Sequence, residues 1–190
     1  MSTITVTVLD AFGNPVSGAT VKLQDSPSNG NQLTQPVGVT DANGVATGTL
    51  SSTVVGTKTI TASVGGATIT QTATVVVNPA DASQLVFTTQ PADVIIDQVI
   101  SPAVVITALD PFRNVATGFA GEVQIAIAHD GSGLLGPATL GGTTTVPAVA
   151  GVATFSDLTL DRTGLLYTLA VSAGGVTGAT SDLFNVVVLP

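Results

Sequence analysis

The amino-acid sequence predicts an all-β protein made of two tandem β-sandwich domains with no substantial helix. Three observations lead to this fold class. Apolar residues recur at every second position, turn-forming residues interrupt that alternation at short intervals, and a set of short motifs occurs twice in the same order. A period of two places one face of a strand in a core and the other face in water, whereas a helix needs a period of about 3.6 residues.

The alternating segments mark the expected strands. They are Ile4/Val6/Val8, Val21/Leu23, Ile60/Ala62/Val64, Leu85/Phe87, Val123/Ile125/Ile127, Leu169/Val171 and Phe184/Val186/Val188. Turn signals rich in Gly, Asn and Asp separate them at residues 13–15, 29–31, 41–44, 65–66, 130–133 and 174–175. Short strands between frequent turns are typical of a sandwich or a barrel. The core predicted for the second domain consists of Phe87, Val104, Ile106, Val123, Ile125, Phe155, Leu169, Val171 and Phe184.

An internal repeat predicts two copies of one fold. The repeated motifs are Leu9–Asn14 with Leu109–Asn114, Gly44–Thr47 with Gly151–Thr154, and Ser63–Gly66 with Ser172–Gly175. We therefore expect one domain at residues 1–79 and a second at residues 80–190. The first copy has almost nothing before its counterpart of residues 104–109, so we expect it to lack the first strand of the sandwich.

Composition excludes several classes of protein. Charged residues make up 8% of the chain, against about 25% in an average domain, while hydrophobic residues make up 44%. The net charge is −8 and the basic residues are Lys22, Lys58, Arg113 and Arg162, so nucleic-acid binding is not expected. Apolar runs are too short for a membrane helix, so we expect no membrane insertion by this segment.

Two sets of motifs resemble known bacterial repeats. Residues 10–21 read Asp-x-x-Gly-Asn-Pro-Val-x-Gly-Ala-x-Val, and residues 40–46 read Thr-Asp-Ala-Asn-Gly-Val-Ala. This half resembles the immunoglobulin-like (Ig-like) repeats of invasin- and intimin-type surface proteins. The second half opens with Leu85-Val86-Phe87 and is similar to repeats of large bacterial and archaeal surface proteins. The resemblance implies Ig-like sandwiches located outside the cell or at its surface.

One residue departs from the family pattern. Arg113 stands where the family usually has Gly in the tight turn after the first shared strand. Because a non-glycine residue rarely adopts a positive φ, we expect Asn114 to take that conformation instead.

His129 is the single histidine, and Asp130 and Ser132 follow it closely. A catalytic interpretation would join these three residues, but they belong to an Asp-Gly-Ser-Gly turn without a nucleophile-elbow pattern. We therefore expect a solvated loop histidine. One histidine and no cysteine also leave too few ligands for a structural zinc site.

Aspartates in the loops are candidate calcium ligands, because calcium needs six to eight oxygens. The candidate groups are Asp10 and Asn14 with Asp41 and Asn43, and Asp81 with Asp110 or Asp182. The alternative is that these side chains cap their own turns. No dense run of aspartates occurs, so we predict no metal site and no cofactor.

The sequence allows specific predictions for Lys22, Lys58 and Tyr167, whose side chains are long and polar at the end. Surface Ig-like modules can carry a Lys–Asn cross-link beside a buried acid, and residues 1–79 contain Lys22 and Lys58 but no Glu. We expect a solvated lysine rather than a cross-link. The spacing of Asp161, Gly164 and Tyr167 resembles the tyrosine corner of Ig folds, which implies a buried ring whose hydroxyl bonds to backbone a few residues upstream.

These observations predict a structural or spacer module of a secreted or cell-surface microbial protein. Two explanations of the open strand edge stay open: the first strand was removed from a longer chain, or an extended segment of a neighbouring molecule fills the gap and assembles the module into a fibre. Its expected partners are other protein chains, either neighbouring repeats or subunits. The alternative is an adhesin-type module that recognises a host receptor, glycan or neighbouring surface protein, for which Phe12, Phe112 and Phe119 are the loop residues to examine. No acid–base pair or activated nucleophile is present, so we predict neither catalytic residues nor enzymatic activity.

Overall fold

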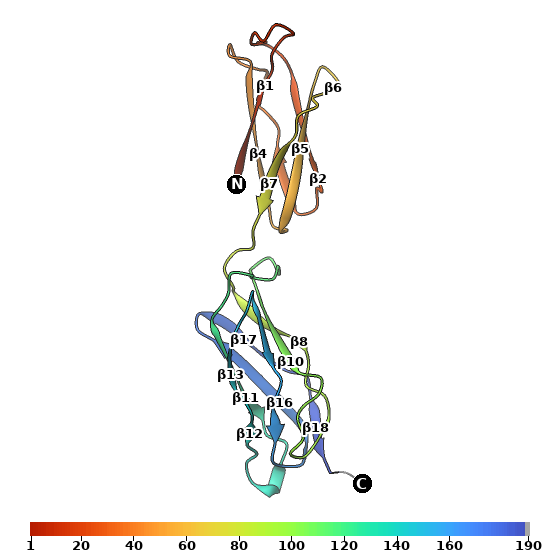
Figure 1. The fold of residues 1–190 in the computed structure, drawn as a ribbon, viewed down its shortest axis with the longest axis vertical. Coiled ribbons are helices and arrows are strands. Elements are labelled where there is room, and N and C mark those ends of the chain that lie inside the picture. Colours follow the sequence, from red (N-terminus) through yellow and green to blue (C-terminus); the bar gives the residue numbers. More distant parts are fainter. Residues whose placement is uncertain (189–190) are drawn as a thin grey trace. The chain divides into compact units, whose positions relative to one another are not determined.

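The computed structural model describes residues 1–188, and the chain divides into two compact units, Met1–Asn78 (unit 1) and Pro79–Pro190 (unit 2) (Figure 1). Both units are built from β-strands, and the helical element in the described part is one 3-10 turn at Gly133–Leu135. The predicted all-β class is therefore confirmed. None of the helical structure described is long and apolar enough to cross a membrane.

Unit 1 consists of two facing sheets, one ordered β1-β4-β3 and the other β2-β5-β6 with β7 also paired to β5. Its strands are β1 (Ser2–Thr7), β2 (Val21–Ser26), β3 (Asn31–Thr34), β4 (Val45–Ser52), β5 (Gly56–Val64), β6 (Ala67–Thr68) and β7 (Ala73–Val77). Alternate residues of these strands point between the sheets. They form a small core of Ile4, Val21, Leu23, Ala46, Leu50, Ile60 and Ala62.

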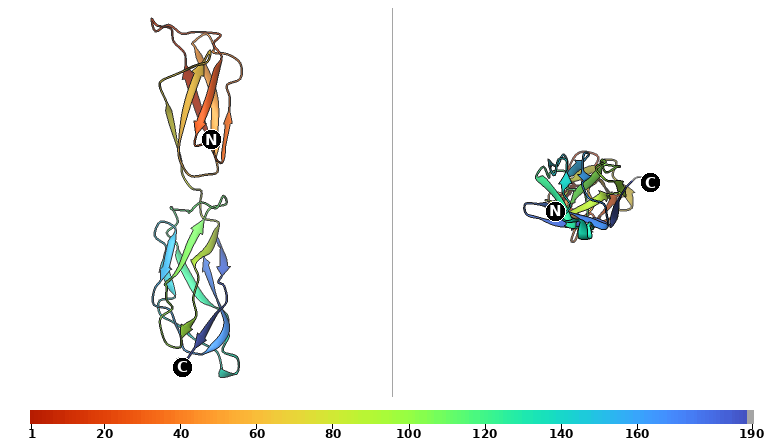
Figure 2. Two further views of the ribbon diagram at one scale, coloured as in Figure 1. Left: turned by 90° about the vertical axis from the view of Figure 1, so that its right-hand side faces the viewer. Right: turned by 90° about the horizontal axis from the view of Figure 1, so that it is seen from below.

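Unit 2 repeats this plan with additional strands (Figure 2). Its main strands are β8 (Gln84–Thr89), β9 (Val94–Ile95), β10 (Val104–Leu109), β11 (Glu122–His129), β13 (Thr145–Pro147), β14 (Val152–Phe155), β16 (Gly164–Ala173), β17 (Val176–Thr180) and β18 (Phe184–Val187). Two short strands, β12 (Leu140–Gly141) and β15 (Thr159–Leu160), pair with each other. Strand β10 lies between β8 and β14, and β16 pairs with β11, β17 and β18.

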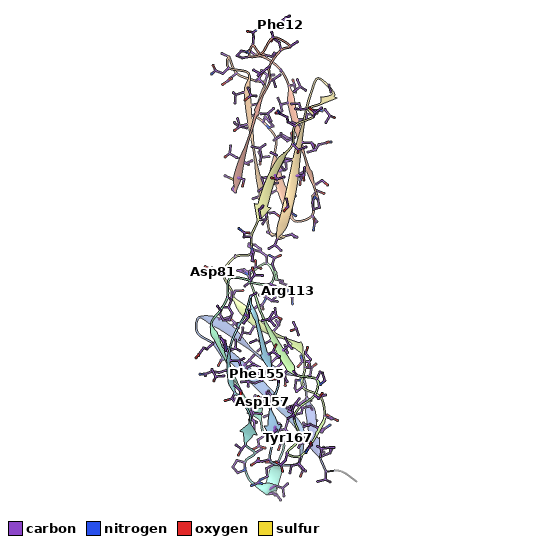
Figure 3. The ribbon with its side chains drawn as sticks, viewed as in Figure 1. Phe12, Asp81, Arg113, Phe155, Asp157 and Tyr167 are labelled. Carbon is purple, nitrogen blue, oxygen red and sulfur yellow. The ribbon has the colours of Figure 1, made fainter. Side chains whose placement is uncertain are left out.

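The core predicted for unit 2 agrees closely with the structure. Eight of the nine predicted residues are buried, and the ninth, Phe87, is partly buried and packs against the same cluster. Phe155 and Tyr167 both lie inside this unit in Figure 3. The period-two alternation therefore identified the correct face of each strand.

The repeated motifs occupy equivalent places in the two units. Strand β1 corresponds to β10, β4 to β14, and β5 to β16, because the motifs beside these strands match. The loops that follow β1 and β10 have the same hydrogen bonds: Asp10 N–H donates to the Asn14 carbonyl at 2.9 Å, and Asp110 N–H donates to the Asn114 carbonyl at 2.9 Å. The repeat in the sequence is therefore a repeat of backbone geometry.

The expected conformation of Arg113 is wrong. Arg113 itself adopts a positive φ of 69°, and its counterpart Gly13 has a φ of 84°. Asn114 is held in place because its N–H and its side-chain amide both donate to the Asp110 carboxylate, at 2.8 Å each. These bonds fix the turn, so the strain falls on the residue at the glycine position.

The outward faces of the strands carry hydroxyl groups more often than charges. Along β1 the exposed residues are Thr3, Thr5 and Thr7, which alternate with inward apolar residues. In unit 2 the hydroxyl of the exposed Thr88 hydrogen-bonds at 3.0 Å to that of Thr107, which is buried on the neighbouring strand. Threonine therefore supplies much of the polar surface on these strands.

Candidate functional site

The side chains around His129 stabilise a loop. His129 is exposed at the end of β11. The Asp130 carboxylate accepts the N–H groups of Ser132 and Ala138 at 2.9 and 2.7 Å, and the Ser132 hydroxyl donates to the Gly136 carbonyl at 2.6 Å. Hydrogen bonds from Ser132 and then from Ala138 lower the pKa of Asp130. This geometry holds a turn and does not align a nucleophile with a base.

The loop aspartates likewise bond to their own turns. Asp10 accepts the N–H groups of Phe12 and Asn14 at 2.9 Å each, and Asp41 accepts those of Asn43 and Val45 at 2.8 and 2.9 Å. These bonds, led by those from Asn14, lower the pKa of Asp10. Within residues 1–188, no three Asp, Glu, His or Cys side chains gather as they would around a metal ion. The turn-capping interpretation therefore describes these aspartates.

Within residues 1–188, Asp110 accepts a hydrogen bond from outside its own turn, which its counterpart Asp10 does not. Its side chain is buried, and besides holding its own turn it accepts the Ala80 N–H at 3.1 Å from the segment by which the chain enters unit 2. Burial opposes the charge on Asp110, but the hydrogen bonds from Asn114, Ala80 and Phe112 together outweigh it, and the pKa of Asp110 is lowered. In unit 2 this aspartate therefore ties the incoming chain to the sandwich.

Tyr167 forms the predicted tyrosine corner. Its ring is fully buried, and its hydroxyl donates to the Arg162 carbonyl at 3.1 Å, five residues upstream. The ring lies 5.9 Å from that of Phe184, between centroids. Burial, followed by the nearby Asp130 carboxylate, raises the pKa of Tyr167. The prediction of a buried ring with a backbone partner is confirmed, and the residue has a structural role.

Lys58 contradicts the expectation of a solvated lysine. Its side chain is 1% exposed, on the inward face of β5, and its Nζ donates to the Asn29 carbonyl at 3.4 Å. The sequence contains a signal for this placement, because Lys58, Ile60 and Ala62 are alternate residues of one strand and share a face. Lys22, in contrast, is exposed on β2 as expected.

The edge of unit 1 at β1 is open where the corresponding edge of unit 2 is covered. In the described residues β1 has β4 as its strand partner, whereas its counterpart β10 pairs with β14 on one side and β8 on the other. Val6 on β1 is only partly buried, but the equivalent Ile106 on β10 is 1% exposed. The inward face of β1 therefore lacks the cover that β8 gives to β10.

A groove of about 160 Å³ runs beside this open edge. Its lining comes from β1, β5 and the segment leading into β7, and includes Ile4, Val6, Ile60, Ala62, Ile69 and Ala73. The corresponding segment of unit 2 is residues 84–100: its Leu85, Val94 and Ile100 are buried in the core, and β9 pairs parallel with β18. The groove is therefore the place that an extended strand occupies in the other unit, and it is the candidate binding site of the chain.

Aromatic residues in the loops behave differently from one another. Phe12 is 92% exposed and Phe112 is half-exposed. Figure 3 places Phe12 at the end of a loop of unit 1. Phe119 instead packs against the core of unit 2. Of the three residues singled out from the sequence, Phe12 is therefore the one that presents a whole aromatic ring to solvent.

Comparison with known proteins identifies the fold of these units. Residues 1–77 match the family model of the bacterial Ig-like domain, group 1. The match covers nearly all of unit 1. The whole chain is also similar to a solved structure of InvD from Yersinia pseudotuberculosis, with 21% identity and a TM-score of 0.54 over 97% of this chain. The predicted Ig-like fold and the resemblance to bacterial surface repeats are thus confirmed.

Other similar structures are the Escherichia coli adhesin FdeC, with 19% identity and a TM-score of 0.49, and a bacterial integrin-binding invasin, with 22% identity and a TM-score of 0.40. The chain covers 51% of the InvD structure, 59% of the FdeC structure and 35% of the invasin structure. The chain therefore spans about half the length, or less, of the solved structures it matches.

Proposed function

We propose that the chain is a structural spacer module of a bacterial cell-surface protein, and that the β1 edge of unit 1 pairs with an extended strand from a neighbouring repeat or subunit. The observation that carries the proposal is the groove beside β1, which residues 84–100 fill in unit 2. The match of unit 1 to the bacterial Ig-like domain and the similarity of the chain to InvD support the location at the cell surface.

The chemistry of the groove favours a β-strand as its occupant. An edge strand presents unpaired N–H and C=O groups, which an added strand can satisfy while its alternate side chains enter the groove. Leu85 and Phe87 are the side chains that β8 contributes in unit 2. A strand of the same pattern, antiparallel to β1, would cover Ile4 and Val6 in the same way.

The proposal is tested by giving unit 1 its own first strand. One variant carries a copy of residues 79–101 ahead of Ser2, and a matched control carries the same extension with its Leu85 and Phe87 copies changed to Thr. We expect the extended chain to melt at a higher temperature than the original chain, because the groove is filled. The control extension should give little gain, because its side chains cannot fill an apolar groove.

Sedimentation of the same proteins distinguishes the source of the strand. If a subunit supplies it, the original chain associates as concentration rises and the extended chain stays monomeric. If a neighbouring repeat of one polypeptide supplies it, both stay monomeric and the extended chain is the more stable. Equal stability of two monomers would show that unit 1 needs no further strand.

A second candidate function is adhesion, favoured by exposed apolar side chains in the loops of unit 1. Phe12, Val37 and Val39 lie in loops that are joined by the hydrogen bond from the Gly18 N–H to the Thr40 carbonyl, at 3.0 Å. An adhesive surface there should lose binding to cultured host cells when Phe12 is changed to Ser. Phe112→Ser in unit 2 is the matched control, and equal binding by both variants and the original chain would exclude a role for this loop.

A further inference from the structure

Lys58 is an unusual residue for the interior of so small a core. Lysine is almost never fully buried unless it is paired, and Lys58 is 1% exposed. In the described residues its Nζ makes one hydrogen bond, to the Asn29 carbonyl, and the 3.4 Å length exceeds the usual range of about 2.7–3.2 Å. The fold therefore holds a primary amine inside unit 1 with a weak partner.

An amide with an unused oxygen lies at the same end of the core. The Asn31 Oδ1 atom is buried and, alone among the buried side-chain polar atoms of residues 1–188, has no hydrogen-bond partner. Its Nδ2 atom donates to the Asp25 carboxylate and, at 2.7 Å, to the Pro27 carbonyl. A buried polar atom without a partner calls for an explanation in a folded protein.

The three side chains come from three strands and share the inward face. Asp25 follows the buried Leu23 on β2, and the antiparallel register pairs Asp25 with Ile60, so Lys58 is its diagonal neighbour across β5. Asn31 precedes the inward Leu33 on β3, which belongs to the opposite sheet. The Lys58 amine reaches the turn between β2 and β3, at a residue two positions before Asn31.

We propose that Lys58 and Asn31 react to form an intramolecular amide bond, with Asp25 carrying the proton. The Nζ–Cγ bond forms, the Cγ–Nδ2 bond breaks, and a proton from Nζ passes through the Asp25 carboxyl to Nδ2, which leaves as ammonia. No oxidation or reduction occurs, so no further reactant is needed. Holding the groups together supplies an effective concentration of about 10⁵–10⁸ M when they are well oriented, and burial keeps water from competing.

The product would join the two sheets of unit 1 covalently. Asn31 belongs to the β1-β4-β3 sheet and Lys58 to the β2-β5-β6 sheet. The amide N–H would donate to the Asp25 carboxylate, and the chain between residues 31 and 58 would form a closed loop. Such a bond suits a domain that must resist unfolding under tension, because the sheets could no longer separate.

Mass spectrometry tests the proposal directly. The intact chain is expected to weigh one ammonia molecule less than its sequence. After denaturation, trypsin should fail to cut at Lys58, because its amine is acylated, and should release one fragment, residues 23–113, that carries the deficit. Lys58→Arg and Asn31→Ala should each show full sequence mass, and Asp25→Ala should do so or react more slowly. Lys22→Arg, which changes the exposed lysine of β2, should keep the deficit.

A rescue variant keeps the test decisive if the other substitutions disturb folding. Asn31→Asp offers a carboxyl in place of the amide, so it should lose one water molecule instead of ammonia and still resist trypsin at Lys58. Asn29-Gly30 and Asn43-Gly44 can also lose ammonia by cyclising with their own backbone, but cleavage at Lys58 would then remain. A folded chain at full mass, or a deficit that persists in Lys58→Arg, would overturn the proposal.

Discussion

The two units place different long side chains at the same position of the same strand. Lys58 on β5 corresponds to Tyr167 on β16, and both are almost completely buried. The Tyr167 hydroxyl donates to the Arg162 carbonyl at 3.1 Å, and the Lys58 amine donates to the Asn29 carbonyl at 3.4 Å. At this position the fold therefore accommodates a long side chain with an apolar stem and a polar end group. The tip can be an inert hydroxyl or a nucleophilic amine, and in unit 1 it is the amine.

A second difference concerns how fully each core is packed. Phe155 fills the core of unit 2 opposite Val104, whereas unit 1 has Gly48 opposite Ile4. A Cβ atom on Gly48 would lie 2.5 Å from the Thr34 carbonyl oxygen, so this position has no room for a side chain. Unit 2 therefore depends on a large aromatic residue and a covering strand, while unit 1 has a thinner core and an open edge.

The largest expected effect tests the packing of unit 2. Phe155→Ala should destabilise unit 2 by about 3–5 kcal/mol, because it removes a fully buried ring and leaves a cavity. Tyr167 is the single tyrosine and the chain has no tryptophan, so tyrosine fluorescence during urea unfolding reports on unit 2. A loss below about 1 kcal/mol would show that Phe155 does not face the core.

The next effect concerns the amine of unit 1. Lys58→Met keeps an apolar stem of similar length but cannot form the proposed amide bond. If the bond exists, unit 1 should lose about 3–4 kcal/mol, the range for a cross-link that closes a loop of this order of length. Hydrogen exchange of the β5 amides measures unit 1 separately. Unchanged or increased protection would indicate that Lys58 is an unreacted buried amine.

Tyr167→Phe gives the matched change in unit 2. It removes one hydroxyl and leaves the Arg162 carbonyl without that donor, so a loss of about 0.5–1.5 kcal/mol is expected. Circular dichroism must follow this variant, because it has no tyrosine. If Tyr167→Phe lowers the free energy of unfolding as much as is expected for Lys58→Met, the effect of Lys58→Met would not require a covalent bond.

The turns after β1 and β10 provide a reciprocal pair of substitutions. Arg113→Gly should stabilise unit 2 by about 1 kcal/mol, because it relieves a left-handed backbone conformation in a non-glycine residue. Gly13→Arg should destabilise unit 1 by a similar amount, since a Cβ there meets no neighbouring atom and only the backbone is strained. Melting temperatures that move in the same direction for both variants would contradict this account.

The smallest expected effect is a difference in acid sensitivity. The pKa values of Asp110, Asp130, Asp157 and Asp161 in unit 2 are lowered, as is that of Asp10 in unit 1. A carboxyl group whose pKa is lowered by folding stabilises the fold above its unfolded pKa of about 3.9. This stabilisation is lost as the pH falls through the pKa of the folded state. Unit 2 should therefore lose more stability than unit 1 below about pH 4. Equal losses, measured by hydrogen exchange of both units, would count against these turn bonds.

The strands and the tyrosine corner could be predicted from the sequence because they depend on local spacing. Side chains alternate strictly along a strand, so an apolar pattern states which residues face the core. The conformation of Arg113 was predicted wrongly because it is decided by hydrogen bonds from Asn114 to Asp110 and not by the preference of one residue.

The cluster at Lys58 could be predicted only in part. The alternation with Ile60 and Ala62 places Lys58 inward, but the charge of a lysine suggested a solvated side chain. Its neighbours Asp25 and Asn31 depend on the register of β2 with β5 and on the turn between β2 and β3, which no local pattern specifies. Contacts between distant strands therefore required the three-dimensional structure.

The threonine-covered strand faces have a consequence for where such a module can work. Hydroxyl groups such as those of Thr3, Thr5 and Thr7 on β1 neither titrate near neutral pH nor attract counter-ions, so dissolved salt does not screen their hydrogen bonds to water as it screens an exposed ion pair. A surface of this kind keeps the same polarity in dilute fresh water and in brine. A cell does not control the ionic composition of its surroundings. A surface module covered with hydroxyl groups therefore keeps its stability and solubility when the salt concentration outside the cell changes.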